Sequence, residues 1–141
     1  MKDVASEVKV VTAIQPQTAS GESTAINGIT VDRLGYEGAV VACQVGNAGG
    51  DVAPTRFGVT FKVQYKSGET DWVDVSGKTL TVSGETVASG ATAGGEINVD
   101  LKGCARYVRV VATPTFTAGT NPNLDICSTI VLGEAQVGPA T

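Results

Sequence analysis

The sequence contains no histidine. Histidine is the usual general base near neutral pH and a common metal ligand, so its absence excludes Ser-His-Asp and Cys-His catalytic centres and all His-ligated metal sites. Paired carboxylates or a lysine base are not excluded by this argument. Asp71 and Asp74 flank Trp72, but their spacing places them on opposite faces of a strand. We therefore expect a protein that is not an enzyme.

Two segments partly match known phosphate-binding and metal-binding motifs, but each lacks residues that the motif requires. The Gly-Lys-Thr at 77–79 has no earlier phosphate-loop glycine, because Trp72 occupies that position. Asn121, Asn123 and Asp125 alternate like calcium ligands, but the closing glutamate of an EF-hand loop is absent. We expect neither a metal ion nor a cofactor.

Long apolar runs, basic stripes and paired cysteine motifs are also absent. No window approaches the ~18 apolar residues of a membrane-spanning helix, and the amino terminus has no apolar stretch of signal-peptide length. The ten Lys and Arg residues are scattered and the net charge is −4, so neither nucleic-acid nor membrane binding is expected. Cys43, Cys104 and Cys127 are odd in number and form no CxxC pair. We expect buried free thiols and synthesis in a reducing cytoplasm, with one disulfide as the alternative.

Aromatic residues make up only 5% of the chain, whereas glycine occurs 18 times. The core must therefore consist mainly of Val, Ile, Leu and Ala. Strict alternation of apolar and polar residues runs through 59–66 (VTFKVQYK) and again through 96–101 (EINVDL). A period of two is typical of strands with one buried face and one solvated face.

Further strands are expected at the following places: 7–14, 28–32, 36–45 (covered on both faces), 71–75, 78–82, 85–88, 105–117 and 125–134. Tight turns are predicted at 66–71 and 82–85. Short strands with frequent turn signals predict an all-β fold, an antiparallel, jelly-roll-like β-sandwich of about eight to nine strands. We expect one domain over residues 1–141, with a core of about 7–134, loose ends at 1–6 and 136–141, and a loop or arm at 16–24.

Two long polar loops, 46–56 and 118–125, are candidates for contact with a partner because surface loops often carry binding residues. Phe57 and Phe116 lie at loop edges, and Phe57 is compatible with either a surface contact or packing at the core edge. The candidate partner-binding residues are Asn47, Asp51, Arg56, Phe57, Phe116, Asn121 and Asn123.

Trp72 is the only tryptophan. We expect it to cap the sandwich core. The alternative is an exposed platform on which a sugar stacks, as in galactose-binding-like modules, and this would make the chain a carbohydrate-binding protein.

Three groups of segments together carry a resemblance: GITVDRLGYEGA at 28–39, FKVQY at 61–65 with WVDV at 72–75, and ARYVRVV at 105–111 with IVLG at 130–133. In this order they resemble small virion proteins of tailed bacteriophages that decorate or cement the head. The resemblance spans about residues 28–134. Glu134 stands where the family often has a basic residue after the last Leu-Gly, so a charge contact at that position is not carried over.

The resemblance implies a jelly-roll-like sandwich that binds the outer capsid surface and stabilises it. It implies the major capsid protein as partner, a place on the virion after synthesis in the host cytoplasm, and possible self-association as a trimer or another cyclic oligomer. A tail, vertex or head-completion protein with the same fold is the further alternative.

Overall fold

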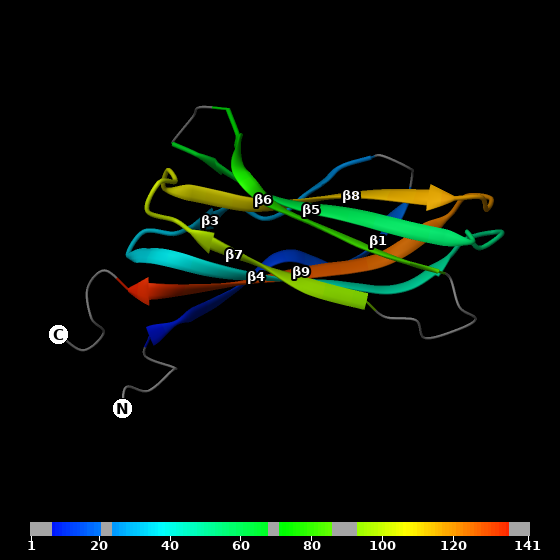
Figure 1. The fold of residues 1–141 in the computed structure, drawn as a ribbon, viewed down its shortest axis with the longest axis horizontal. Helices are drawn as coiled ribbons and strands as arrows, with labels where there is room; N and C mark the ends of the chain where they lie inside the picture. Colours follow the sequence, from blue (N-terminus) through cyan, green and yellow to red (C-terminus); the bar gives the residue numbers. More distant parts are fainter. Residues whose placement is uncertain (1–6, 21–23, 68–70, 86–92, 136–141) are drawn as a thin grey trace.

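The computed structural model describes residues 7–20, 24–67, 71–85 and 93–135 (Figure 1). The predicted loose ends at 1–6 and 136–141 lie outside these residues, as do residues 68–70 of the predicted 66–71 turn and residues 86–88 of one predicted strand. Within the described ranges, no helix is long and apolar enough to cross a membrane.

Nine strands form two antiparallel sheets, which confirms the predicted β-sandwich (Figure 1). Sheet A has the order β1-β9-β4-β7, and sheet B has the order β2-β8-β5-β6, with β3 also paired to β8. The chain passes repeatedly from one sheet to the other, as in a jelly roll. The strands are β1 (Lys9–Ser20), β2 (Ile26–Asn27), β3 (Val31–Asp32), β4 (Tyr36–Gly49), β5 (Arg56–Lys66), β6 (Val73–Glu85), β7 (Ala93–Asp100), β8 (Tyr107–Thr117) and β9 (Asn123–Ala135).

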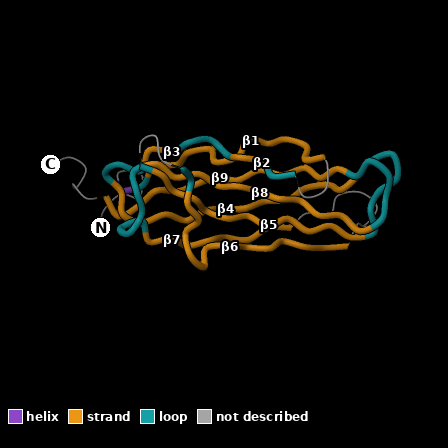
Figure 2. Tube along the Cα trace, turned by 90° about the horizontal axis from the view of Figure 1, so that it is seen from above, coloured by secondary structure: helices purple, strands orange, loops and turns teal. Residues whose placement is uncertain are grey.

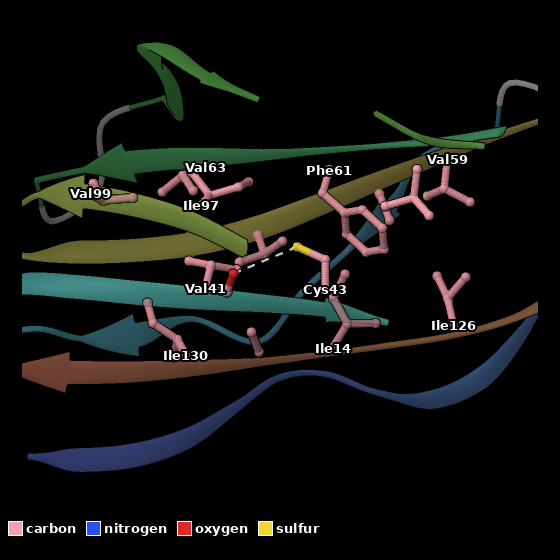
Figure 3. Packing of buried hydrophobic residues seen from close by; sticks show 14 of the residues in the cluster. Ile14, Val41, Cys43, Val59, Phe61, Val63, Ile97, Val99, Ile126 and Ile130 are labelled. Atoms are coloured by element: carbon pink, nitrogen blue, oxygen red, sulfur yellow. Dashed lines mark hydrogen bonds between the residues drawn. The ribbon is translucent and has the colours of Figure 1, made fainter. Parts of the chain in front are cut away.

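The core lies between the sheets and is mainly aliphatic. Alternate residues of β5 point inward, with Phe61 fully buried at the centre. Figure 3 shows Phe61 from sheet B and Cys43 from sheet A among the valines and isoleucines of both layers. The alternation predicted for 59–66 and 96–101 is therefore confirmed, with one exception. Gln64 is buried although it occupies one of the outward, polar positions of the pattern.

Several strands are longer than predicted. β1 continues through Ser20, so residues 16–20 of the loop or arm expected at 16–24 are strand. β4 continues through Gly49 into the expected loop, and it alternates between buried and exposed residues. The expectation that it is covered on both faces is wrong, because its outward side belongs to the open face of sheet A. The two strands predicted within 71–82 are one strand, β6, whose register against β5 shifts between Lys62 and Gln64. The predicted turn at 82–85 is instead paired strand, where Gly84 packs against the ring of Phe57.

The two sheets are joined along one edge by the segment at Gly28. The amide of Gly28 donates to Val110 O of β8 (2.8 Å), and the amide of Ile29 donates to Ala13 O of β1 (2.8 Å). A Cβ at Gly28 would lie 2.5 Å from each of these two carbonyl oxygens. Only glycine fits at this point of close backbone approach.

Candidate functional site

The two loops singled out in the sequence meet at one end of the sandwich. Val52, between β4 and β5, forms an isolated bridge with Thr120, between β8 and β9. The Val52 amide donates to Thr120 O (3.2 Å) and the Thr120 amide donates to Val52 O (2.9 Å). Most loops lie at the two ends of the long axis, as Figure 2 shows. We call residues 50–55 and 118–122 the loop platform.

The conformation of the platform is held by backbone geometry as well as by hydrogen bonds. Asn121 Nδ2 donates to Asp51 Oδ2 across the two loops (2.8 Å). Asn121 has a φ of 46° and Gly50 a φ of 135°. A Cβ at Gly50 would lie 2.5 Å from Asn121 O. The contacts between the two loops therefore fix the conformation of the platform, and no side chain would fit at position 50.

Five of the seven candidate residues lie at or near the surface of this end of the molecule. Asn47, Asp51, Arg56 and Asn121 are exposed, and Asn123 is half-buried at the start of β9 beside Gly49. Val52, with 57% of its surface exposed, was not among the candidates and adds an apolar group to the platform. Its exposure could not be read from the sequence, because an isolated valine in a loop gives no signal of direction.

Phe57 and Phe116 are wrong as surface-contact candidates. Their exposed fractions are 5% and 8%, and they are paired neighbours on β5 and β8 in the core cluster. Phe57 has the inward parity of Val59 on β5, and Phe116 has that of Val110 on β8. For Phe57 the structure therefore selects the second interpretation, packing at the core edge.

Trp72 does not cap the core, which corrects the expectation for this residue. It is half-buried and lies outside the core cluster, with Arg109 Cζ 4.4 Å and Lys66 Nζ 4.9 Å from its ring centroid. Both cations project from the outer side of sheet B. The tryptophan therefore belongs to that outer face.

A chain of polar contacts extends from this tryptophan across sheet B. Arg109 Nε donates to Gln64 Oε1 (2.9 Å), and Gln64 Nε2 donates to Asp74 Oδ1 (2.7 Å). The hydrogen bonds from Gln64 and Lys62 lower the pKa of Asp74, and burial lowers the pKa of Arg109. Gln64 is buried because both ends of its amide are satisfied in this network.

Arg106 and Arg33 stabilise one end of the molecule. Arg106 forms a two-point ion pair with Asp32 (2.7 and 3.0 Å). Arg33 donates to the backbone carbonyls of Ala105 (3.1 Å), Tyr36 (3.2 Å) and Cys104. Two of the three segment groups that carry the family resemblance, those containing 28–39 and 105–111, thus meet at the start of β8. The polar residues Asp32, Arg33 and Arg106 of these segments are therefore explained by contacts that stabilise the fold.

The outer side of sheet A is hollowed in two places. One hollow of about 810 Å³ crosses the middle strands near Gln44, Asp125 and Cys127. The other, of about 570 Å³, lies toward Val40 and Val131. Cys127 is half-buried and donates to Gln44 Oε1 (3.5 Å), while burial raises the pKa of the Cys43 thiol to about 11. All three cysteines are free, as expected.

The calcium-like triplet does not converge. Asn121 bonds to Asp51, and Asp125 Oδ1 accepts a hydrogen bond from Thr18 (2.9 Å) on β1. In the described part of the chain, no group of three or more Cys, Asp or Glu residues is placed to hold a metal ion.

Comparisons with known proteins identify the fold and no family. No protein-family model matches the chain, and no curated protein does. A chain in the structure of infectious bursal disease virus Gx strain matches with a TM-score of 0.60 at 10% identity, covering 94% of this chain and 34% of that one. The VP2 subviral particle of infectious bursal disease virus matches with a TM-score of 0.54 at 8% identity, covering 91% and 33%.

The chain therefore spans about a third of the length of these two viral chains. The SPBc2 prophage-derived protein YomS also matches, at 8% identity with a TM-score of 0.47, over 89% of this chain and 92% of that one. At such low identities the two viral matches show a shared sandwich fold, and the third is too weak to carry an argument.

Proposed function

We propose that the chain is a virion structural protein, not an enzyme, that binds the outer surface of a bacteriophage head and stabilises it. The major capsid protein is its partner in this proposal. The observation that carries it is the loop platform, in which two loops far apart in sequence are joined by a backbone bridge and present exposed polar and apolar groups. A shape that is set before contact loses little conformational freedom on docking.

The mechanism is interfacial. A rigid sandwich places the platform against the capsid lattice, and many identical weak contacts add up over the head. The sandwich shared with two chains of a virus is compatible with this role, as are the segments that resemble head decoration proteins.

The test is co-sedimentation of the purified protein with phage heads that lack it, with bound copies counted per head. We expect saturable binding at hundreds of copies. The double variant Asp51→Ala/Asn121→Ala removes the side-chain link between the platform loops, and we expect it to lower binding at least about tenfold, since two polar contacts contribute about 1 kcal/mol each.

The matched control is Asn27→Ala/Asp71→Ala, which changes the same two residue types at exposed positions away from the platform. It should bind like the wild type. Wild-type-like binding of the platform variant would show that the loops are not the contact. Saturation at about a dozen copies would instead support a tail, vertex or head-completion role.

A carbohydrate-binding module is the second candidate, because Trp72 is half-buried outside the core, beside Arg109, which is itself bonded to Gln64. This is the aromatic group with polar neighbours that sugar recognition needs. The contacts of Arg109 and Lys66 with the ring weigh against it, since they use the surface on which a sugar would stack.

A further inference from the structure

Residues 26–29, which we call the junction segment, tie sheet B to sheet A. The first two of these residues form β2 and pair with β8. The Gly28 amide then donates to Val110 O of β8 (2.8 Å). The next amide, that of Ile29, donates to Ala13 O of β1 in the other sheet (2.8 Å). Four consecutive residues are therefore held by strand pairing or by backbone hydrogen bonds.

The junction segment contains the one Asn-Gly pair of the sequence, Asn27 and Gly28. Asparagine is a chemically labile residue, and a following glycine leaves the attacking backbone nitrogen unhindered by a side chain. In that reaction the Gly28 nitrogen forms a bond to Asn27 Cγ, the side-chain nitrogen leaves as ammonia with the Gly28 amide proton, and a five-membered succinimide remains. Water then opens the ring at either carbonyl, which leaves aspartate or isoaspartate at position 27.

The closed junction opposes this reaction in two ways. The Gly28 N–H is bonded to Val110 O, so the nitrogen has to give up that hydrogen bond before it attacks. Ring closure also turns the peptide group between Asn27 and Gly28, and the partners on both sides hold this group in place. The Asn27 side chain is exposed to water. Deamidation at this position therefore requires opening of the segment and not only access of water.

The fold does not permit a less reactive residue after Asn27. A Cβ at Gly28 would lie 2.5 Å from both Ala13 O and Val110 O. From the labile pair, its exposure and its hydrogen bonds, we propose that Asn27 is a deamidation site, which the closed junction protects and local opening of the junction segment exposes. Short edge segments open locally more readily than core strands do. The proposal does not depend on head binding.

Isoaspartate at position 27 makes the opening permanent. It adds one methylene group to the main chain, so the amides of Gly28 and Ile29 no longer meet their two carbonyl partners in opposite sheets at the same time. The two oxygen atoms close to Gly28 leave no space for a compensating shift of the backbone. Aspartate, in contrast, leaves the main chain unchanged and allows the junction to close.

The test is incubation of the full chain at mildly alkaline pH, with deamidation at position 27 followed by peptide mapping and mass spectrometry. We expect the folded chain to react at least about tenfold more slowly than the chain in concentrated urea, because only the fraction with an open junction reacts. Equal rates in the folded and the unfolded chain would overturn the proposal.

Ile14→Val and its matched control Ile97→Val separate local opening from unfolding of the whole domain. Both isoleucines are buried, but they lie on β1 and β7, the opposite edges of sheet A. Ile14 packs at the junction, since a Cβ at Gly28 would lie 3.2 Å from its Cγ1. We expect Ile14→Val to speed deamidation about twofold to tenfold and Ile97→Val to leave the rate unchanged. Equal rates in the two variants would show that opening is not local.

Refolding of the chain aged in urea gives a second readout. Chains with isoaspartate at position 27 should be absent from the refolded, protease-resistant fraction, whereas Asn27→Asp should fold and resist the protease like the wild type. Circular dichroism of each variant checks that the sandwich is folded. Isoaspartate in the resistant fraction at the same proportion as before refolding would contradict a permanent opening.

Discussion

The two sheets contribute alike to the core but differ on their outer sides. β4 and β9 of sheet A point no charged group outward over 38–44 and 127–133, whereas β5 and β8 of sheet B point outward Arg56, Lys62, Lys66 and Arg109. Inward residues of both sheets are mainly apolar. The inward pattern therefore reports the fold, whereas the outward residues of the central strands differ in charge between the two sheets.

The cations of sheet B are engaged within the chain. Lys62 lies 3.2 Å from Asp74, and Arg109 contacts both Gln64 and Trp72. These polar groups of sheet B are satisfied by contacts within the chain. The outer side of sheet A has apolar groups in contact with water, among them Val10 and Val40, and their burial would release about 25 cal/mol for each Å² covered.

The largest expected effect comes from breaking the junction on which both sheets depend. In Gly28→Ala the new methyl group would lie 2.5 Å from Ala13 O of sheet A and from Val110 O of sheet B. Neither atom can move without disturbing a strand, so we expect a loss of about 3 kcal/mol or more in the free energy of unfolding. Urea denaturation followed by circular dichroism measures it.

Gly103→Ala is the control for this variant. A Cβ at Gly103 meets nothing within 4 Å, and an alanine there should change stability by less than about 1 kcal/mol. Equal stability losses in the two variants would show that the close approach at Gly28 is not what makes the glycine necessary.

An intermediate effect is expected when the network of sheet B loses its aromatic member. Trp72→Ala removes ring contacts with Lys66 and Arg109, each of which contributes about 0.5–1 kcal/mol at an exposed site. We expect the free energy of unfolding to fall by about 1 kcal/mol. Val73→Ala is the neighbouring control.

The same variant separates the two candidate functions. We expect neither the wild type nor Trp72→Ala to bind on a glycan array. Binding by the wild type that disappears in the variant would favour a carbohydrate-binding module.

The sequence predicted strands correctly where apolar and polar residues alternate because one face is buried. It failed to predict where strands end and whether a glycine lies in a strand or in a turn. The strand at 59–66 was predicted correctly because every second residue enters the core. Gly84 was assigned to a turn, yet it lies in β6 because the ring of Phe57 needs the space. Extending the inward parity of Val59 to Phe57 would have placed that ring in the core.

Contacts between distant segments could not be predicted. The Val52–Thr120 bridge and the contact of Trp72 with Arg109 depend on which strands are neighbours. Alternation gives the two sides of each strand but not the order of strands in a sheet. The sequence therefore predicted two separate loops, and only the order of the strands in the fold brings them together.

The smallest expected effect concerns the ion pair at the end of sheet B. Hydrogen bonds from Arg106 and from the Leu34 amide lower the pKa of Asp32 from its ordinary value of 3.8 to about 2. A carboxylate with a lowered pKa in the folded state contributes stability above about pH 4, and this contribution is lost as the pH falls through about 2. The pair is solvent-exposed, so its contribution is small. Asp32→Asn should therefore be slightly less stable than the wild type in urea at pH 7 and equally stable at pH 2, whereas a difference of the same size at both pH values would mean that the charge of Asp32 does not stabilise the fold.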